Sequence, residues 1–178
     1  DTNIILKKLT TPVKFTGTSG IQTYLSCTFP SGMFLTGKIA RVNCGGFYMN
    51  NGASSTYTWT LTISYGGTTL FADASGGNTT QTNNGAWHVS FDLAAKSNTN
   101  QRLAGVCHYQ TPGTKVAPIV GHAGDFNVVT HVQTPFCGST AASVDSDTAD
   151  RVLAVQWTMS NAGAGLSTTI NYGTVELI

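Results

Sequence analysis

The stretch TYTWTLTISYGG, from Thr56 to Gly67, alternates between two kinds of side chain without a break. The odd-numbered residues from 57 to 65 are all aromatic or aliphatic, and the even-numbered residues from 56 to 64 are all threonine or serine. Because successive side chains of a strand point to opposite faces of a sheet, the alternation predicts a β-strand over residues 56–65 with one face in a hydrophobic core. The Gly66-Gly67 pair predicts a tight hairpin after it, since both central residues of a type I′ turn need positive φ.

The rest of the chain repeats this pattern in runs separated by glycine, proline, asparagine and serine. Further strands are expected over residues 4–9, 21–27, 33–44, 68–75, 86–93, 103–109, 126–132, 151–160 and 168–178. No convincing helix pattern and no repeat of fixed period accompanies them. The sequence therefore predicts one all-β domain over residues 1–178, an antiparallel, jelly-roll-like β-sandwich of about eight to ten strands.

The composition indicates a β protein with few charges. Charged residues make up 10% of the chain, against about 25% in ordinary globular domains, and the net charge is +1. Lysine and arginine are scattered, so the cation cluster of a nucleic-acid surface is missing. No apolar run reaches the roughly 18–20 residues of a membrane span. We therefore expect neither nucleic acid nor a membrane as a partner.

The first residue, Asp1, is not a methionine. A mature product, a trimmed chain and a domain cut from a longer protein are all compatible with this beginning.

The four cysteines form no CxxC pair, which argues against a zinc ribbon or a redox motif. They are Cys27, Cys44, Cys107 and Cys137. Two disulfides, whose connectivity the sequence does not determine, are the alternative if the protein is extracellular. We favour thiols buried in the core, because free cysteine behaves as a small hydrophobe. All four thiols are then expected to resist a thiol reagent until the protein is denatured.

The sequence shows no clear catalytic constellation. A glycosidase needs two facing carboxylates, and a strand-borne pair such as Asp92 with Glu176 is one arrangement that nothing singles out. His122 lies near Asp125 and His131, but no GxSxG nucleophile elbow accompanies them. The glycine-rich stretches lack the P-loop pattern. We expect a protein that is not an enzyme and has no cofactor, with a polysaccharide depolymerase as the enzymatic alternative.

The densest acidic stretch, DSDTAD, contains Asp145, Asp147 and Asp150. Closely spaced carboxylates on a loop can bind Ca²⁺, which takes six to eight oxygen ligands. The glycine and the distal glutamate of an EF-hand loop are missing, so we favour a solvated turn that leads into the strand at residue 151.

The aromatic residues suggest a second function class, carbohydrate binding, in which exposed rings stack on sugars. Aromatic residues at strand parity are more often core residues. Tyr48, in GGFYMNNG, is the expected exception because loop signals surround it, and Asn50 and Asn51 are the neighbouring candidates for glycan contact. The candidate contact loops are residues 45–54, 75–85 and 110–125.

The last quarter of the chain, STAASVDSDTADRVLAVQWTMSNAGAGLSTTINYGTVELI from Ser139 to Ile178, resembles the endings of tailed-bacteriophage virion proteins. In those proteins a Thr/Asp-rich turn leads into a strand of the LAVQW type, and a small-residue loop precedes a closing strand. The resemblance implies a β-sandwich structural domain exposed on a virion, either a capsid-decoration (cement) protein or a fibre or spike head. It implies a homotrimer that contacts other virion proteins, the major capsid or tail proteins, with a host-surface glycan as a further partner.

The threonine and serine face of the strand predicted over residues 56–65 is typical of a surface that contacts another subunit. Threonine and serine can be half buried without the cost of desolvating a charge, so the face suits contact with another subunit as well as with water.

Overall fold

The computed structural model describes residues 3–17, 19–50, 59–74, 84–111, 130–139, 144–160, 162–163 and 165–178. Within these ranges the chain forms eleven β-strands and no helix. The strands are β1 (Ile4–Leu9), β2 (Val13–Thr16), β3 (Gly20–Phe29), β4 (Ile39–Asn50), β5 (Trp59–Tyr65), β6 (Thr68–Ala74), β7 (Asn84–Ser97), β8 (Asn100–Thr111), β9 (Thr130–Ser139), β10 (Arg151–Met159) and β11 (Leu166–Leu177). Since these residues form no helix, none of them makes a helical span long and apolar enough to cross a membrane.

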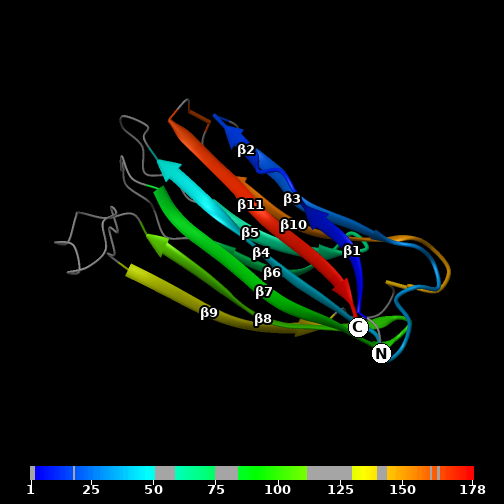
Figure 1. The fold of residues 1–178 in the computed structure, drawn as a ribbon. Helices are drawn as coiled ribbons and strands as arrows, with labels where there is room; N and C mark the ends of the chain where they lie inside the picture. The colour runs from blue at the N-terminus through cyan, green and yellow to red at the C-terminus, as the bar shows by residue number, and fades with distance from the viewer. Residues whose placement is uncertain are drawn as a thin grey trace.

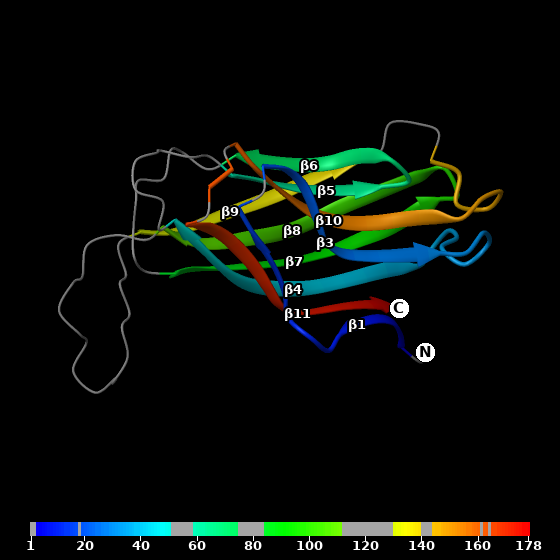
Figure 2. The same cartoon turned by 90° about the horizontal axis from the view of Figure 1, so that it is seen from above.

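The strands form two antiparallel sheets that face each other as two layers (Figure 1, Figure 2). The larger sheet has the order β1-β11-β4-β7-β8-β9, with β2 also paired to β11, and the smaller has the order β3-β10-β5-β6. The predicted all-β antiparallel sandwich is confirmed. The expected strand number was too low, because the described residues alone contain eleven strands.

The core lies between the two sheets and follows the parity that the sequence shows. Leu61, Ile63 and Tyr65 of β5 are fully buried, as the opening alternation predicts. The inward residues of β10, beside β5 in the same sheet, and of β7, in the opposite sheet, are also buried: Leu153, Val155, Trp157, Met159, Trp87, Val89, Phe91 and Leu93. Each such large side chain contributes about 1.5–3 kcal/mol of burial free energy.

The hairpin predicted at Gly66-Gly67 joins β5 to β6. Both glycines have positive φ, 55° and 84°, as a type I′ turn requires. At the far edge Phe71 of β6 stacks on Phe136 of β9 with ring centroids 4.1 Å apart, and this contact joins the two sheets there.

Three strand predictions differ from the structure. The strand expected over residues 33–44 begins at Ile39 and continues to Asn50, because residues 33–38 form turns and Gly45-Gly46 stay within the strand. The short strand β2 was not predicted. The strand expected over residues 126–132 falls partly outside the described residues, and β9 extends beyond it to Ser139.

The cysteines are free thiols. Cys27, Cys44 and Cys107 are buried, which confirms the interpretation as core thiols for three of the four. The same expectation is wrong for Cys137, which is exposed because it lies on the outward parity of the edge strand β9, beside the buried Phe136.

Candidate functional site

The outward face of the larger sheet carries a row of three rings, which we call the ring row: Tyr172 of β11, His88 of β7 and His108 of β8. The ring centroids of Tyr172 and His88 are 6.3 Å apart, with 30° between the planes. Those of His88 and His108 are 6.0 Å apart, with 29° between the planes. The three rings therefore lie side by side across the strands, perpendicular to the strand direction.

Strand register explains why Tyr172 reaches His88 across an intervening strand. Tyr172 is paired with Gly45 of β4, and Gly45 is paired with His88. A Cβ atom on Gly45 would lie 2.6 Å from the hydroxyl oxygen of Tyr172 and 2.9 Å from its ring carbon Cζ. The phenol ring thus covers the position that a side chain at residue 45 would fill, and only glycine leaves it room.

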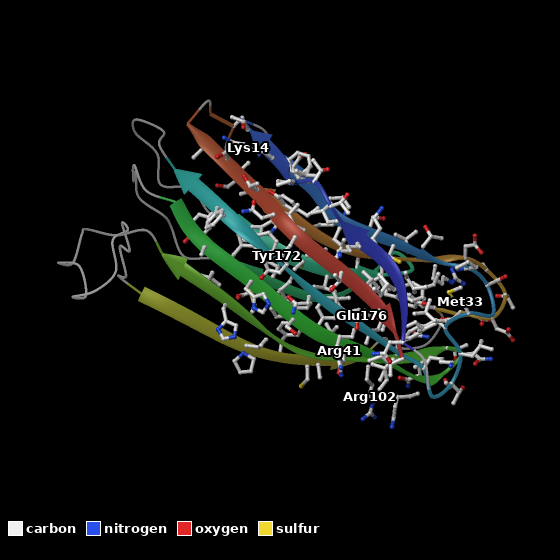
Figure 3. All side chains as sticks on the ribbon, in the orientation of Figure 1. Lys14, Met33, Arg41, Arg102, Tyr172 and Glu176 are labelled. Carbon is white, nitrogen blue, oxygen red and sulfur yellow. The ribbon has the colours of Figure 1, made fainter. Side chains whose placement is uncertain are left out.

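A β-bulge explains why Tyr172 points outward at all. Ile170 and Tyr172 have the same sequence parity, yet Ile170 is fully buried and Tyr172 is 47% exposed. The register between β11 and β4 shifts between these two residues, so the inserted residue, Asn171, reverses the parity of the strand beyond it. Figure 3 shows Tyr172 partway along β11, in front of the larger sheet.

Polar side chains flank the ring row on one side. Thr174 of β11, Asn43 of β4 and Ser90 of β7 are paired across the strands, two residues along from the ring row on each of their strands. Nε2 of His88 donates to Oδ1 of Asn43 at 2.9 Å, which fixes the imidazole plane. The ring row is therefore bordered by amide and hydroxyl groups.

The nearest ion pair lies two residues beyond Asn43 and Ser90 on the same two strands. The guanidinium of Arg41 binds the carboxylate of Asp92 through two hydrogen bonds, 2.9 and 3.0 Å long. Glu176 is paired with Arg41 on the other side. In Figure 3, Arg41 and Glu176 lie toward the end of β11, away from Tyr172.

Two pKa shifts follow from packing in the ring row. Partial burial lowers the pKa of His88, and the neighbouring His108 lowers it further. Partial burial raises the pKa of the Tyr172 phenol. His88 and Tyr172 are therefore neutral near pH 7, since both shifts favour the uncharged form.

Phe47 enlarges the apolar part of this face. It lies on the outward parity of β4, two residues from Gly45, and is 44% exposed. The strands pair it with Thr169 on one side and Ala86 on the other.

Tyr48 is buried in the core and does not lie on the surface as the sequence predicts. Its side chain is 0% exposed, so the expectation of an exposed ring is wrong. The physical reason is that β4 continues through Gly45-Gly46, which places Tyr48 on the inward parity of a central strand. Asn50 ends β4 and its side chain lies outside the described part, as does Asn51.

The loops suggested for glycan contact fall mainly in ranges that the structure does not describe. Residues 45–50 belong to β4, and residues 51–54, 75–83 and 112–125 lie outside the described ranges. The same holds for His122 and Asp125, and for the side chain of His131.

The acidic stretch forms the turn before β10. Asp145 accepts hydrogen bonds from the backbone N–H of Asp147 at 2.9 Å and from the hydroxyl of Thr148 at 3.1 Å. The first of these lowers the pKa of Asp145 most. Asp150 accepts from the backbone N–H of Ser31 at 2.9 Å. The carboxylates thus stabilise a turn, and the described residues contain no cluster of three or more metal-binding side chains.

The carboxylate pair considered for a glycosidase lies on an open face. Asp92 and Glu176 are on strands to either side of β4, with Arg41 paired to both. Both carboxylate oxygens of Asp92 are engaged by the Arg41 guanidinium. This is the geometry of a surface ion pair, with Arg41 between the two carboxylates, and not of two carboxylates that face each other.

The outward face of the smaller sheet is uncharged, and we call it the threonine face. Its residues come from four paired strands, β3, β10, β5 and β6. They are Ile21, Thr23, Ser26, Thr28, Val152, Ala154, Gln156, Thr158, Thr60, Thr62, Ser64, Thr69 and Ala72. None of these is ionisable. Ile21 and Val152 are exposed.

No family model and no curated protein matches the chain. Among solved structures the chain is similar to the CBM2 module of the evolved Dit of Lactobacillus casei BL23 phage J-1, with 8% identity and a TM-score of 0.34 over 98% of this chain and 95% of that one. It is also similar to a structure of the infectious bursal disease virus Gx strain, with 12% identity and a TM-score of 0.30 over 99% of this chain and 39% of that one.

Proposed function

We propose that the chain is a structural domain on the surface of a virus particle, a capsid-decoration or fibre-head domain of a tailed bacteriophage that acts by assembling into a homotrimer. Its role is mechanical and not enzymatic. Each subunit buries area against its neighbours and against the major capsid or tail proteins, and many weak contacts add together through multivalency.

The threonine face is the observation that supports this proposal. A solvent-facing sheet surface normally carries charges, and the described residues of this one carry none. Its hydroxyls and small side chains can be covered by a neighbouring subunit without desolvating an ion, and the exposed Ile21 and Val152 add apolar area. One hydrogen bond, from Nε2 of Gln156 to Oγ1 of Thr23, already satisfies part of its polar surface within the subunit.

The resemblance of residues 139–178 to phage virion proteins supports the biological setting. In the structure this stretch supplies β10, the second strand of the threonine face, and β11, a central strand of the larger sheet. The part of the chain that resembles virion proteins therefore helps to build both sheets.

The test is the mass of the native particle, measured by light scattering on a sizing column. We expect three times the subunit mass of 18.7 kDa. The variant Thr62→Glu is expected to dissociate the particle, because an unpaired carboxylate buried in an interface costs several kcal/mol. The matched control is Thr174→Glu, the same substitution on the outward face of the larger sheet, which should leave the mass unchanged.

A wild-type chain that remains a monomer across the accessible concentrations would contradict the proposal. Equal dissociation by the two variants would place the contact elsewhere than the threonine face.

A further inference from the structure

We infer that the ring row on the larger sheet is a binding site for a neutral saccharide chain. This function goes beyond assembly and uses the opposite face of the sandwich from the threonine face. The site consists of Tyr172, His88 and His108, with Asn43 and Thr174 beside them.

The first step concerns the rings. One face of a pyranose presents C–H groups, and aromatic rings attract such groups through the negative potential above their π faces. Tyr172 extends over Gly45 toward His88, and its side chain is 47% exposed. The three rings continue across β11, β4, β7 and β8, so an extended chain of sugar units could lie along them.

The second step concerns hydrogen bonds. Sugar hydroxyls leave water without penalty only when polar groups replace it. Thr174, Asn43 and Ser90 lie two residues from the ring row on their strands, which is about 6–7 Å along a strand. The rings would thus supply stacking and the neighbouring amide and hydroxyl groups would supply hydrogen bonds.

The third step concerns charge. His88 has a lowered pKa and is hydrogen-bonded to Asn43, so it is a neutral ring near pH 7. Arg41 and Asp92, four residues from Gly45 and His88 on their strands, neutralise each other in a two-bond ion pair. Two lysines at the edge of the sheet lie closer, because Lys8 of β1 is paired with Thr174 and Lys14 of β2 is paired with Thr169. The polar side chains that border the rings, those of Asn43, Thr174 and Ser90, are uncharged, which favours a neutral saccharide. The two lysines make an anionic polysaccharide the necessary comparison.

The fourth step concerns preorganisation. The phenol of Tyr172 is held over Gly45, and the imidazole of His88 is fixed by Asn43, so both rings are in place before a ligand arrives. Binding then costs less side-chain entropy than it would on flexible loops.

The experiment is calorimetric titration of the full chain with neutral oligosaccharides of glucose, galactose, mannose and N-acetylglucosamine, with heparin as the anionic comparison. We expect at least one neutral oligosaccharide to bind. Tyr172→Ala should weaken that binding by about tenfold or more, and Tyr172→Phe should retain most of it, because the ring remains. The matched control is Ile21→Ala, an exposed apolar residue on the threonine face, which should leave binding unchanged.

Absence of binding to every neutral oligosaccharide would overturn the inference, as would binding of heparin alone. Binding that survives Tyr172→Ala would overturn it as well. If Tyr172→Ala fails to fold, His108→Ala provides the same comparison at the other end of the row. The particle mass of each variant, measured in parallel, separates a failure of this site from a failure of assembly.

Discussion

The cysteines show how strongly a single residue's chemistry depends on its place in the strand. Cys44 of β4 and Cys107 of β8 lie on the inward face of the larger sheet, on either side of β7. Burial raises the pKa of both thiols, that of Cys107 to about 12. Burial also raises the pKa of Cys27. Cys137 is exposed on the outward parity of β9. Because the thiolate is the reactive form, exposure and pKa together predict reactivity.

We therefore expect one thiol per chain, Cys137, to react with a thiol reagent in the native protein. The other three should react only after denaturation, when burial no longer suppresses the thiolate. Mass spectrometry of labelled peptides distinguishes the sites, and Cys137→Ser should abolish native labelling. Labelling of Cys44 or Cys107 at the rate of Cys137 would contradict the burial that this prediction rests on.

Two tyrosines show what residue-level sequence patterns can and cannot predict. Tyr48 is surrounded by glycine and asparagine, which usually indicate a loop, but its strand continues and buries it. Tyr172 lies in an apolar closing strand, where alternation counted from Ile170 places it inward, and it is instead exposed. The sequence does contain one signal for this. The apolar residues Leu166 and Ile170 are even-numbered, whereas Val175 and Leu177 are odd-numbered, and a change of parity within a strand indicates a bulge.

At the scale of elements, the contact between β4 and β11 depends on glycine. A Cβ atom on Gly46 would overlap the carbonyl oxygen of Thr169 and would lie 2.9 Å from the Cα atom of Ile170. These are backbone atoms of a paired strand, so they cannot move away as a side chain could. The contact lies beside the bulge at Asn171, where β11 departs from regular pairing with β4.

Gly46→Ala is therefore expected to destabilise the domain by about 3 kcal/mol, because two central strands must separate locally. The measurement is urea-induced unfolding. The control is Gly163→Ala, where a Cβ atom would meet only Leu166 at 3.7 Å, an ordinary van der Waals contact. That variant should change the stability by less than about 1 kcal/mol. Equal effects from the two substitutions would refute the steric argument.

The elements with strict alternation were predictable, and those decided by tertiary contacts were not. Strand β5 and its glycine hairpin, strand β7 and strand β10 follow directly from period-2 patterns. The extent of β4 does not follow from the pattern, because a Gly-Gly pair usually indicates a turn. Gly45 and Gly46 are strand residues here, and the Tyr172 ring and the backbone of β11 occupy the space that a side chain at these positions would fill. The ring row has no sequence signature either, since its rings come from residues 88, 108 and 172 and meet only through strand order.

At the scale of the whole molecule, the two outward faces differ in what they offer. The threonine face has no ionisable side chain, and the larger face combines an ion pair with the ring row. Subunit contact and ligand contact can thus use opposite sides of one sandwich. A buried polar network supports both sheets at one end, where Nε2 of Gln101 donates to the carbonyl of Val144 at 3.2 Å and the hydroxyls of Tyr65 and Ser146 are 2.9 Å apart.

The stability of the whole domain should fall in mild acid because of His88. Its pKa in the folded state is lowered from 6.5 by partial burial and by His108, and the unfolded state has the ordinary value. The unfolded chain therefore binds the proton first as the pH falls. Stability is unaffected above the unfolded pKa, decreases as the pH passes below about 6.5, and levels off only below the folded pKa. The groups that face His88 are His108, Tyr172 and Asn43, and Tyr172 stays neutral throughout this range.

The measurement is urea-induced unfolding of the full chain from about pH 8 to about pH 5. We expect the free energy of unfolding to decrease over the acidic half of that range. His88→Gln keeps an amide donor near Asn43 and removes the titrating ring. This variant should therefore show a smaller decrease in the free energy of unfolding as the pH falls. His108→Gln should remove the smaller, electrostatic part of the effect, because it removes only the neighbouring charge. If the wild type and His88→Gln lose stability in parallel, the acid sensitivity arises from other groups and the ring row does not control it.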